Sequence, residues 1–446
     1  QMVWIKPLFL METGIAREMM RLRQHPCRIR EVQIDKALTW VQKKLLINLA
    51  EEQLTAVACG LKAKTLIITG GPGTGKSTIT KAILTITERI ANQIVLAAPT
   101  GRAAKRMSEI TGKKASTIHS LLEMDFKIGK FKRNKQNPIC CDLLIIDEAS
   151  MIDTQLMYNL LKAVPDDARI ILIGDIDQLP SIGPGNVLKD LIASERISVT
   201  ELKKIFRQGA GSLIVTNAHR INQGQFPDIS YHPRSDFQFI EKEDPQDVID
   251  TIVNLIGNQL PKAYRFHRFD DIQVLSPMKR GLIGSENLNV VLQQKLNPSP
   301  TALHRMGRSF QIGDKVMQIR NNYEKEVYNG DVGKITEIDL TEQTLKVVFD
   351  LKIISYDFTQ IDELILAYAV SIHKYQGSEC PCIIIPIHTS HFKMLYRNLL
   401  YTGLTRGKKR VVFVGTKKAL AIAVKNEDVL RRYTRLKQII QKLIQV

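Results

Sequence analysis

IITGGPGTGKST, residues Ile67–Thr78, places an apolar run directly before a glycine-rich loop, which is followed by helix-forming residues. This order predicts a buried strand, a loop whose backbone N–H groups turn inward, and a helix N-terminus, which together surround phosphate oxygens. Lys76 would reach the terminal phosphates, and the Ser77 hydroxyl would coordinate Mg²⁺. The stretch therefore predicts an α/β fold that binds a nucleoside triphosphate.

Two acidic residues follow another apolar run downstream, in LLIIDEAS at Leu143–Ser150. A buried strand that ends in adjacent carboxylates suits a metal-dependent triphosphatase. Asp147 would hold the magnesium ion, usually through water, and Glu148 would polarise the attacking water. An acidic helix start after a core strand is the alternative interpretation, and the upstream glycine-rich loop favours the catalytic one.

Three further residues have the chemistry expected around a reacting phosphate. ILIGDIDQLPSIGPG, at Ile171–Gly185, predicts a strand and a loop that carries Gln178, whose amide would contact the γ-phosphate or the attacking water. Arg207 lies in IFRQ and Arg406 lies in YTGLTR. Phosphoryl transfer gathers negative charge on oxygens, which arginines stabilise, so the short motif around each arginine favours a catalytic role over a solvent-facing one.

Short apolar runs alternate with helical patterns along most of the chain. This rhythm is typical of parallel sheets buried on both faces and predicts two α/β domains. The runs are Thr65–Thr69, Ile94–Ala98, Leu143–Ile146 and Ile170–Gly174, then Ile272–Leu275, Leu364–Val370, Cys382–Ile387 and Val411–Gly415.

Two segments interrupt the rhythm. Phe126–Pro138 is basic and predicts a hairpin between two strands of the first domain, whereas 303–358 shows short alternating runs that predict a small inserted β-barrel. The expected organisation is a helical segment over 1–45, a first motor domain over 46–205 with the hairpin at about 123–139, a second over 206–302 and 359–446, and the barrel over 303–358.

Composition favours a polyanion partner. The chain has 446 residues, with 63 Lys and Arg against 45 Asp and Glu and a formal net charge of +18. The basic excess could merely keep the surface soluble. Because the chain also carries a nucleotide-binding motif, a nucleic-acid partner is the better interpretation of this charge.

No apolar run approaches the roughly twenty residues of a membrane span. Six scattered cysteines indicate reduced thiols in a cytoplasmic protein, and Gln1 with no signal-peptide cleavage site suggests a fragment of a longer chain.

Taken in order from about residue 46, these segments resemble a superfamily 1 helicase, and more closely the RecD-type family of DNA helicases. GGPGTGKST is similar to motif I, APTGRAAKRM at 98–107 to motif Ia, IIDEAS to motif II and GDIDQLPSIGPG to motif III. IFRQ resembles motif IV, AYAVSIHKYQGSE at 367–379 motif V, and YTGLTR motif VI. The resemblance implies two RecA-like parallel-sheet P-loop motor domains, a Src-homology-3-like barrel, and the hairpin as a strand-separating pin.

The resemblance also assigns nucleotide contacts and catalytic roles. Arg207 would bind phosphate and Arg406 would act as an arginine finger, beside Lys76, Asp147, Glu148 and Gln178. Ser77 and Asp147 would hold Mg²⁺. The residues expected around ATP are Gln53, Gly71, Pro72, Gly73, Thr74, Gly75, Lys76, Ser77, Thr78, Gln376, Gly377 and Glu379.

A single DNA strand would cross both motor domains and be gripped mostly through its phosphates. Tyr375 departs from the family pattern, which has a small residue before the motif V glutamine. The expected DNA contacts are Thr100, Arg102, Lys105, Arg106, Thr117 and His119 in the first domain, with His373 and Lys374 in the second.

These features predict an ATP-dependent DNA helicase of recombination or repair that acts on single-stranded and duplex DNA as a monomer. Translocation toward the 3′ end is implied by the resemblance alone, and single-stranded-DNA-binding protein or recombination factors are candidate partners. The helicase part of a conjugative relaxase, an RNA helicase of the same superfamily and an inactive DNA-binding scaffold remain the alternatives.

Overall fold

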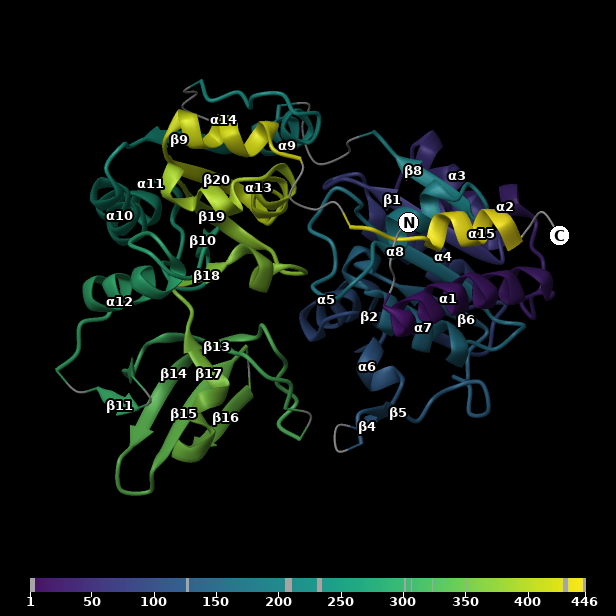
Figure 1. Cartoon of the computed structure of the whole chain (residues 1–446), viewed down its shortest axis with the longest axis horizontal. Helices are drawn as coiled ribbons and strands as arrows, with labels where there is room; N and C mark the ends of the chain where they lie inside the picture. Colours follow the sequence, from purple (N-terminus) through teal and green to yellow (C-terminus); the bar gives the residue numbers. More distant parts are fainter. Residues whose placement is uncertain are drawn as a thin grey trace. The chain divides into compact units, whose positions relative to one another are not determined.

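The chain forms two compact units. The computed structural model describes residues 5–125, 128–204, 211–230, 235–300, 302–305, 307–322, 324–350, 352–427 and 432–443. The first unit comprises Gln1–Gln208 with Leu430–Val446, and the second comprises Gly209–Val429 (Figure 1). Across those described ranges, no helix combines the length and the apolar character that a membrane crossing requires.

A parallel sheet forms the centre of the first unit. Its strand order is β3 (Ala115–Thr117), β2 (Ile94–Ala98), β6 (Leu143–Ile146), β7 (Arg169–Gly174), β1 (Thr65–Gly70) and β8 (Ser198–Leu202). Successive side chains of a strand point to opposite faces, so Leu144 and Ile146 join one apolar cluster while Leu143 and Ile145 join the other. Both faces are buried, as the continuous apolar runs predict.

Helices cover both faces of this sheet. On one face lie α1 (Lys6–Gln24), α7 (Thr154–Ala163), α8 (Val187–Ala193) and α15 (Leu436–Leu443). On the other lie α2 (Ile34–Leu45), α3 (Glu51–Lys62), α4 (Lys76–Thr87) and α5 (Gly101–Thr111). The packing of α15 against α1 and α8 differs from the expectation that 359–446 belongs wholly to the second domain, because Leu436 and Ile440 complete the apolar cluster of the first unit.

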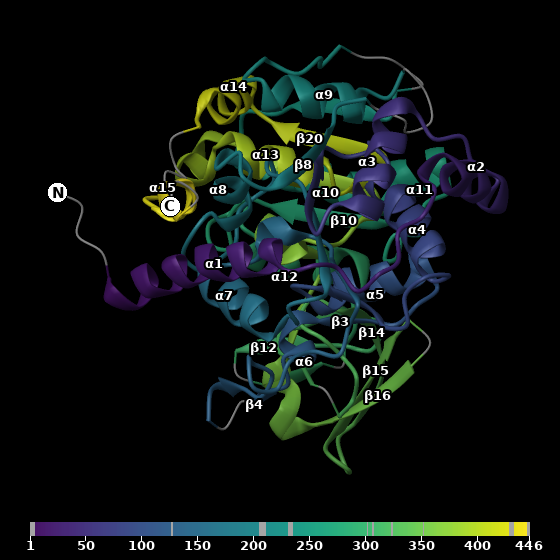
Figure 2. The same cartoon turned by 90° about the vertical axis from the view of Figure 1, so that its right-hand side faces the viewer.

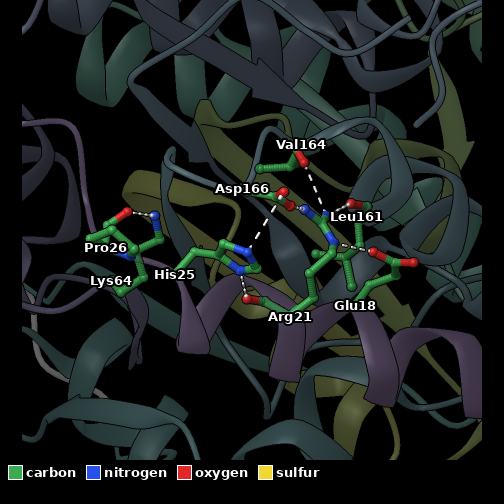
Figure 3. Close-up of polar contacts among 8 residues, drawn as sticks. All are labelled: Glu18, Arg21, His25, Pro26, Lys64, Leu161, Val164 and Asp166. Atoms are coloured by element: carbon green, nitrogen blue, oxygen red, sulfur yellow. Dashed lines mark hydrogen bonds and ion pairs between the residues drawn. The ribbon is translucent and has the colours of Figure 1, made fainter. Parts of the chain in front are cut away.

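Polar contacts fix α1 to the end of α7 (Figure 3). The Arg21 guanidinium donates hydrogen bonds to the carbonyl oxygens of Leu161, at 2.9 Å, and Val164, at 3.0 Å, and pairs with the carboxylates of Glu18 and Asp166. The last carbonyls of a helix lack the usual partners within that helix, so Arg21 supplies a donor to Val164 O and a second donor to Leu161 O, which also accepts from Val164 N–H at 3.3 Å. The helical segment expected over 1–45 is therefore docked on the first unit.

The second unit has its own parallel sheet. The strand order is β18 (Ala369–Ser371), β10 (Ile272–Ser276), β19 (Cys380–Ile387), β20 (Gly407–Gly415) and β9 (Phe237–Glu241). One face carries α9 (Leu213–Asn222), α13 (Arg397–Leu404) and α14 (Lys417–Lys425), and the other carries α10 (Pro245–Asn254), α11 (Leu260–Tyr264) and α12 (Ser285–Leu296) (Figure 1).

An antiparallel sheet is inserted in this unit, in the order β16 (Lys352–Asp357), β15 (Thr344–Phe349), β14 (Val332–Asp339), β13 (Lys315–Gln318) and β17 (Leu364–Leu366). A hairpin of β11 (Leu303–Arg305) and β12 (Arg308–Phe310) and a short 3-10 helix, η3 (Phe358–Glu363), accompany it. Figure 2 shows β14, β15 and β16 extending away from β10 and α10. The sheet encloses its own core, which includes Phe310, Val316, Ile335, Leu345, Val347 and Tyr356.

The expectation of one strand over Leu364–Val370 is wrong. Leu364–Leu366 pairs with β13 in the antiparallel sheet, whereas Ala369–Ser371 pairs with β10 in the parallel one. The chain changes sheets at Ala367 and Tyr368, whose carbonyl oxygens accept hydrogen bonds from Gln273 Nε2 at 3.0 and 3.1 Å. An uninterrupted apolar run cannot reveal such a change, because both flanking segments are buried.

The basic insertion in the first unit contains a short hairpin of β4 (Met124–Asp125) and β5 (Lys130–Phe131). Phe126 and Lys127 lie outside the described residues. Residues 132–139 form an irregular loop, which Arg133 anchors by donating to Glu123 Oε1 at 2.6 Å. The paired strands therefore lie near the start of the range expected for the hairpin.

Candidate nucleotide and nucleic-acid sites

The glycine-rich loop joins the end of β1 to the first turn of α4. Gly73 and Gly75 have φ angles of +75° and +89°, a backbone region that L side chains rarely adopt, which is why glycine is needed at both positions. Lys76 Nζ donates to the carbonyl oxygens of Gly70, at 2.5 Å, and Gly71, at 2.9 Å. The ammonium thus lies over the loop, where phosphate oxygens would compete for it, as expected of a P-loop.

Gln53 braces this loop from α3. Its Nε2 donates to Thr74 O at 3.1 Å, and its Oε1 accepts from Ala50 N–H at 3.1 Å. A Cβ at Gly75 would lie 2.2 Å from Gln53 Nε2, so the glycine also allows this close approach. The structure gives Gln53 a role in loop support, and its expected contact with ATP stays a prediction.

Asp147 and Glu148 follow β6, as the sequence predicts. Asp147 Oδ1 accepts a hydrogen bond from Glu148 N–H at 2.8 Å, and Asp147 N–H donates to Ala97 O at 3.0 Å. Glu148 has a φ of +51° and leads into the 3-10 turn Ala149–Met151. A non-glycine residue in this left-handed region is strained, and such strain is concentrated at functional sites.

Gln178 lies in the loop after β7 and is 7% exposed. Its Nε2 donates to Asp175 Oδ2 at 3.1 Å, and Asp175 Oδ1 accepts from Asp177 N–H at 3.0 Å. Asp175 therefore organises the loop, a role that sequence reasoning missed although a strand ending in Gly-Asp was visible. Because β1, β6 and β7 are parallel neighbours, Lys76, Glu148 and Gln178 all follow the same edge of one sheet.

The second unit brings its motif V and motif VI residues together. The Arg406 guanidinium is 3% exposed and donates to Thr402 O at 3.2 Å and Ser378 O at 3.4 Å. Ser378 lies in the loop that also carries Gln376, Gly377 and Glu379. Gly377 has a φ of +75°, and Glu379 pairs with Lys408 Nζ at 3.5 Å. Arg207 lies outside the described residues, so its role stays a prediction.

Two of the expected DNA contacts are also helix caps. The Thr100 hydroxyl accepts from Ala103 N–H at 3.3 Å and starts α5, which carries Arg102, Lys105 and Arg106. The Thr117 hydroxyl accepts from Ser120 N–H at 3.0 Å and starts α6 (Ile118–Leu121). Capping by threonine is stabilising in itself. Both helices begin at the carboxyl ends of parallel strands, β2 and β3, where ligands of such sheets bind.

His119 links α6 to the basic hairpin. Its ring lies 5.8 Å from the ring of Phe131, measured between centroids, and burial lowers the pKa of His119 below its ordinary value. The imidazole is therefore neutral at neutral pH and would act as a hydrogen-bonding or stacking group rather than as a cation.

In the second unit, His373 and Lys374 lie in the 3-10 turn Ile372–Tyr375, and burial lowers both pKa values. Tyr396 Oη contacts His373 Nε2 at 3.3 Å. Lys374 lines a pocket of about 860 Å³ between α12 and the hairpin β11–β12, and the nearby cations Lys279 and Arg308 further lower its pKa. Sequence reasoning missed these two cations, since neither stands in a recognisable motif.

The two expected Mg²⁺ ligands, Ser77 and Asp147, would complete the coordination of the ion only together with substrate phosphates and water. Among the described residues, no group of three or more His, Cys, Asp and Glu side chains forms a metal cage. Mg²⁺ is usually bound by one or two protein ligands plus substrate phosphates and water. Ser77 and Asp147, which follow β1 and β6, supply a hydroxyl and a carboxylate of the required kind.

Three known families match separate parts of the chain. The AAA domain family matches residues 53–184. The ATP-dependent RecD-like DNA helicase SH3 domain family matches 288–349, and the UvrD-like helicase C-terminal domain family matches 366–414. The first of these contains the P-loop, the second most of the antiparallel sheet, and the third the loops of Gln376 and Arg406.

Two relatives extend the similarity over most of the chain. The ATP-dependent RecD2 DNA helicase of Deinococcus radiodurans is 35% identical over 399 residues, which cover 90% of this chain and 53% of that protein. The chain thus spans about half the length of that relative. The RecBCD enzyme subunit RecD of Mycolicibacterium smegmatis is 27% identical over 417 residues, which cover 85% of this chain and 73% of the relative.

Solved structures support the same fold. A structure of two coordinating Pif1 helicases at forked double-stranded DNA aligns with a TM-score of 0.53 and 20% identity, covering 82% of this chain and 92% of that one. A crystal structure of Pif1 helicase from Bacteroides in complex with ADP-AlF3 and single-stranded DNA aligns with a TM-score of 0.52 over the same shares. Matched family models, sequence identity and fold agree, and over the matched residues the chain is homologous to the RecD-like helicases.

Proposed function

We propose that the chain hydrolyses ATP at the P-loop of its first unit and couples hydrolysis to movement along single-stranded DNA and to duplex unwinding. The observation that carries this proposal is the convergence of Lys76, Glu148 and Gln178 at the edge of one parallel sheet, each on a loop that follows a different strand. Phosphoryl transfer depends mainly on positioning and on stabilising charge, and this arrangement supplies both.

Each residue has a distinct task in this proposal. The loop amides and Lys76 hold the phosphates, and Glu148 polarises the attacking water. Mg²⁺, held by Ser77, Asp147 and the phosphates, would neutralise charge on the phosphate oxygens. Gln178 contacts the γ-phosphate or the attacking water. By resemblance, Arg406 and Arg207 would add positive charge that stabilises the transferring phosphate.

DNA would be held by groups from both units. The cap hydroxyls of Thr100 and Thr117 and the basic residues of α5 provide one grip, and His373 with Lys374 provides the other. Lys374 lies beside Lys279 and Arg308 in the 860 Å³ pocket, where cations that repel one another favour an anion such as a phosphate. From the resemblance of its motifs we further propose 5′-to-3′ movement and a role in recombination or repair. We also propose that the chain acts as a monomer in the cytoplasm.

ATPase measurements with single-stranded DNA test the nucleotide site. Lys76→Ala removes the ammonium and should lower turnover at least about a hundredfold, whereas Glu148→Gln should lower it by roughly 10² to 10⁴ while still binding a fluorescent ATP analogue. Lys81→Ala, which removes an exposed charge from the same helix, should behave like wild type. Wild-type turnover by Lys76→Ala would show that the site is misassigned.

The nucleic-acid proposal has a separate test. DNA and RNA oligonucleotides of equal length are compared as activators, and unwinding is measured on duplexes with a 5′ or a 3′ overhang, with and without ATP. DNA-stimulated turnover with unwinding from the 5′ overhang is the expected result. Preferential stimulation by RNA, or ATPase activity that never responds to DNA, would contradict it.

A further inference from the structure

The segment at 432–443 follows α14 of the second unit in sequence but packs on the first unit. Its residue Arg432 forms hydrogen bonds with a loop of the first unit. Arg432 Nη1 donates to Gly185 O at 2.7 Å, to Ser181 Oγ at 3.2 Å and to Gly183 O, and Nη2 donates to Ser181 O. One guanidinium therefore binds three backbone carbonyls of a single loop. The same connection between β7 and α8 carries Gln178.

The opposite side of the loop is fixed by the start of α7. Thr154 N–H donates to Pro184 O at 3.0 Å. A Cβ at Gly183 would lie 2.0 Å from Asp153 Oδ2, and a Cβ at Gly185, whose φ is +98°, would lie 2.0 Å from Thr154 Oγ1. The glycines let the loop approach α7 closely, and Arg432 closes it from the other side. The loop has no strand or helix of its own, so these contacts define its shape.

Arg432 is itself held in place by its own segment. Arg435 N–H donates to Glu12 Oε2 at 3.0 Å, and Leu436 and Ile440 of α15 are 1% exposed in the apolar cluster with α1 and α8. Burial lowers the pKa of Arg432, and nearby Asp153 opposes that shift. An arginine presents several donors in a rigid planar fork, whereas a lysine presents a single ammonium group, so lysine cannot reproduce the contacts to all three carbonyls.

We propose that Arg432 is a positioning residue that holds the 181–185 loop so that Gln178 is placed for hydrolysis. This inference rests on the proposed role of Gln178. No motif contains Arg432, and its partners lie some 250 residues earlier in the sequence.

DNA-stimulated ATP hydrolysis is measured for Arg432→Ala, Arg432→Lys, Gln178→Ala and the double variant Arg432→Ala/Gln178→Ala. Lys442→Ala is the matched control, since it removes one exposed positive charge from the same segment. We expect Arg432→Ala to lower kcat about tenfold while KM and the affinity for a fluorescent ATP analogue stay within about twofold. Arg432→Lys should lose most of the same activity, and the control should not.

The double variant separates positioning from a purely structural role. If Arg432 acts through Gln178, Arg432→Ala costs nothing further in the Gln178→Ala background, because residues that act as a unit are not additive. If the double variant loses kcat by the product of the two single losses, the inference is overturned. It is also overturned if Arg432→Ala unfolds at a lower temperature but keeps the wild-type kcat. If Gln178→Ala is impaired but Arg432→Ala matches the control, only this inference fails. Wild-type turnover by Gln178→Ala would instead refute the proposed role of Gln178, and this inference with it.

Discussion

Two residues near the nucleotide loop show features that their sequence motifs do not reveal: the backbone angle of Glu148 and the hydrogen bonds of Gln53. Glu148 keeps a φ of +51°, which costs about 1 kcal/mol or more and persists only because the surrounding structure requires it. Gln53 Nε2 donates to Thr74 O in the P-loop, while its Oε1 accepts from Ala50 N–H at the start of α3. The local motifs around these residues predicted where they lie but not these contacts, because a backbone angle or a brace depends on neighbours that a motif does not contain.

A buried histidine should make the second unit sensitive to acid. His391 is 2% exposed in the 3-10 segment Thr389–Met394, and burial, with a contribution from His388, lowers its pKa from 6.5 to about 4. Between these values the unfolded chain binds a proton that the folded chain does not. The contribution of neutral His391 to the free energy of unfolding is therefore fully present above pH 6.5. It is lost as the pH falls through 4, by about 3 kcal/mol in total.

Urea unfolding at pH 7, 5.5 and 4.5 checks this prediction. His391→Leu should flatten the decline of unfolding free energy over that range, whereas His304→Leu, at an exposed position of the same unit, should leave the wild-type slope. Equal slopes for wild type and His391→Leu would show that another group causes the acid sensitivity.

At the scale of elements, the central strands of the two parallel sheets were predictable, whereas three of the four edge strands of those sheets were not. Expected runs correspond to β1, β2, β6, β7, β10, β19 and β20, which lie inside the sheets and read as continuous apolar stretches. The strands β3, β8 and β9, which stand at sheet edges, contain polar residues such as Ser116, Glu201 and Gln238. An edge strand has one neighbour and partly exposed side chains, so its sequence lacks the apolar signal.

Among the residues of the candidate sites, too, some could be found from the sequence and others could not. Residues that follow a central strand, such as Lys76, Asp147 and Gln178, could be found from a strand and its loop. Arg432 could not, because it reaches its partners only through tertiary packing. Lys279 and Arg308 are similar cases: single basic residues in a chain with 63 Lys and Arg carry no signal until the fold brings them to one pocket.

The short hairpin gives a prediction at this scale. Replacing residues 125–130 with a two-glycine turn removes its tip but keeps Phe131 beside His119 and the Glu123–Arg133 pair. If the tip parts the duplex, unwinding should fall at least about tenfold while DNA-stimulated ATP hydrolysis stays within about twofold.

Helicase and ATPase assays run on the same preparation check this result. Lys132→Ala, which removes an exposed charge beside the hairpin, controls for lost electrostatic attraction and should retain unwinding. Normal unwinding by the shortened variant would exclude a pin role for the hairpin, and a joint loss of both activities would point to damage of the first unit.

At the scale of the whole molecule, the chain leaves the first unit after β8, forms the second unit, and returns to pack α15 on α1 and α8. The first unit therefore depends on segments far apart in the sequence. Arg21 is central to the docking of α1, since its side chain is 14% exposed and it satisfies two carbonyls at the end of α7.

Arg21→Ala should destabilise the first unit by about 2 kcal/mol, because it leaves buried carbonyl acceptors without their charged donor. Urea unfolding, together with hydrogen exchange of the α1 and α7 amides, measures the effect. Arg17→Ala, at an exposed position of the same helix, should change stability by less than about 0.5 kcal/mol. Equal stabilities of the two variants would contradict the role assigned to Arg21.

The return of α15 also has a consequence for biosynthesis. A ribosome releases the chain from its N-terminal side, so β1 to β8 emerge long before Leu436 and Ile440 exist. Throughout translation of the second unit, α1 lacks the helix that later packs beside it. The partly synthesised protein therefore exposes apolar side chains of α1, the kind of surface that chaperones recognise, until α15 emerges and covers them.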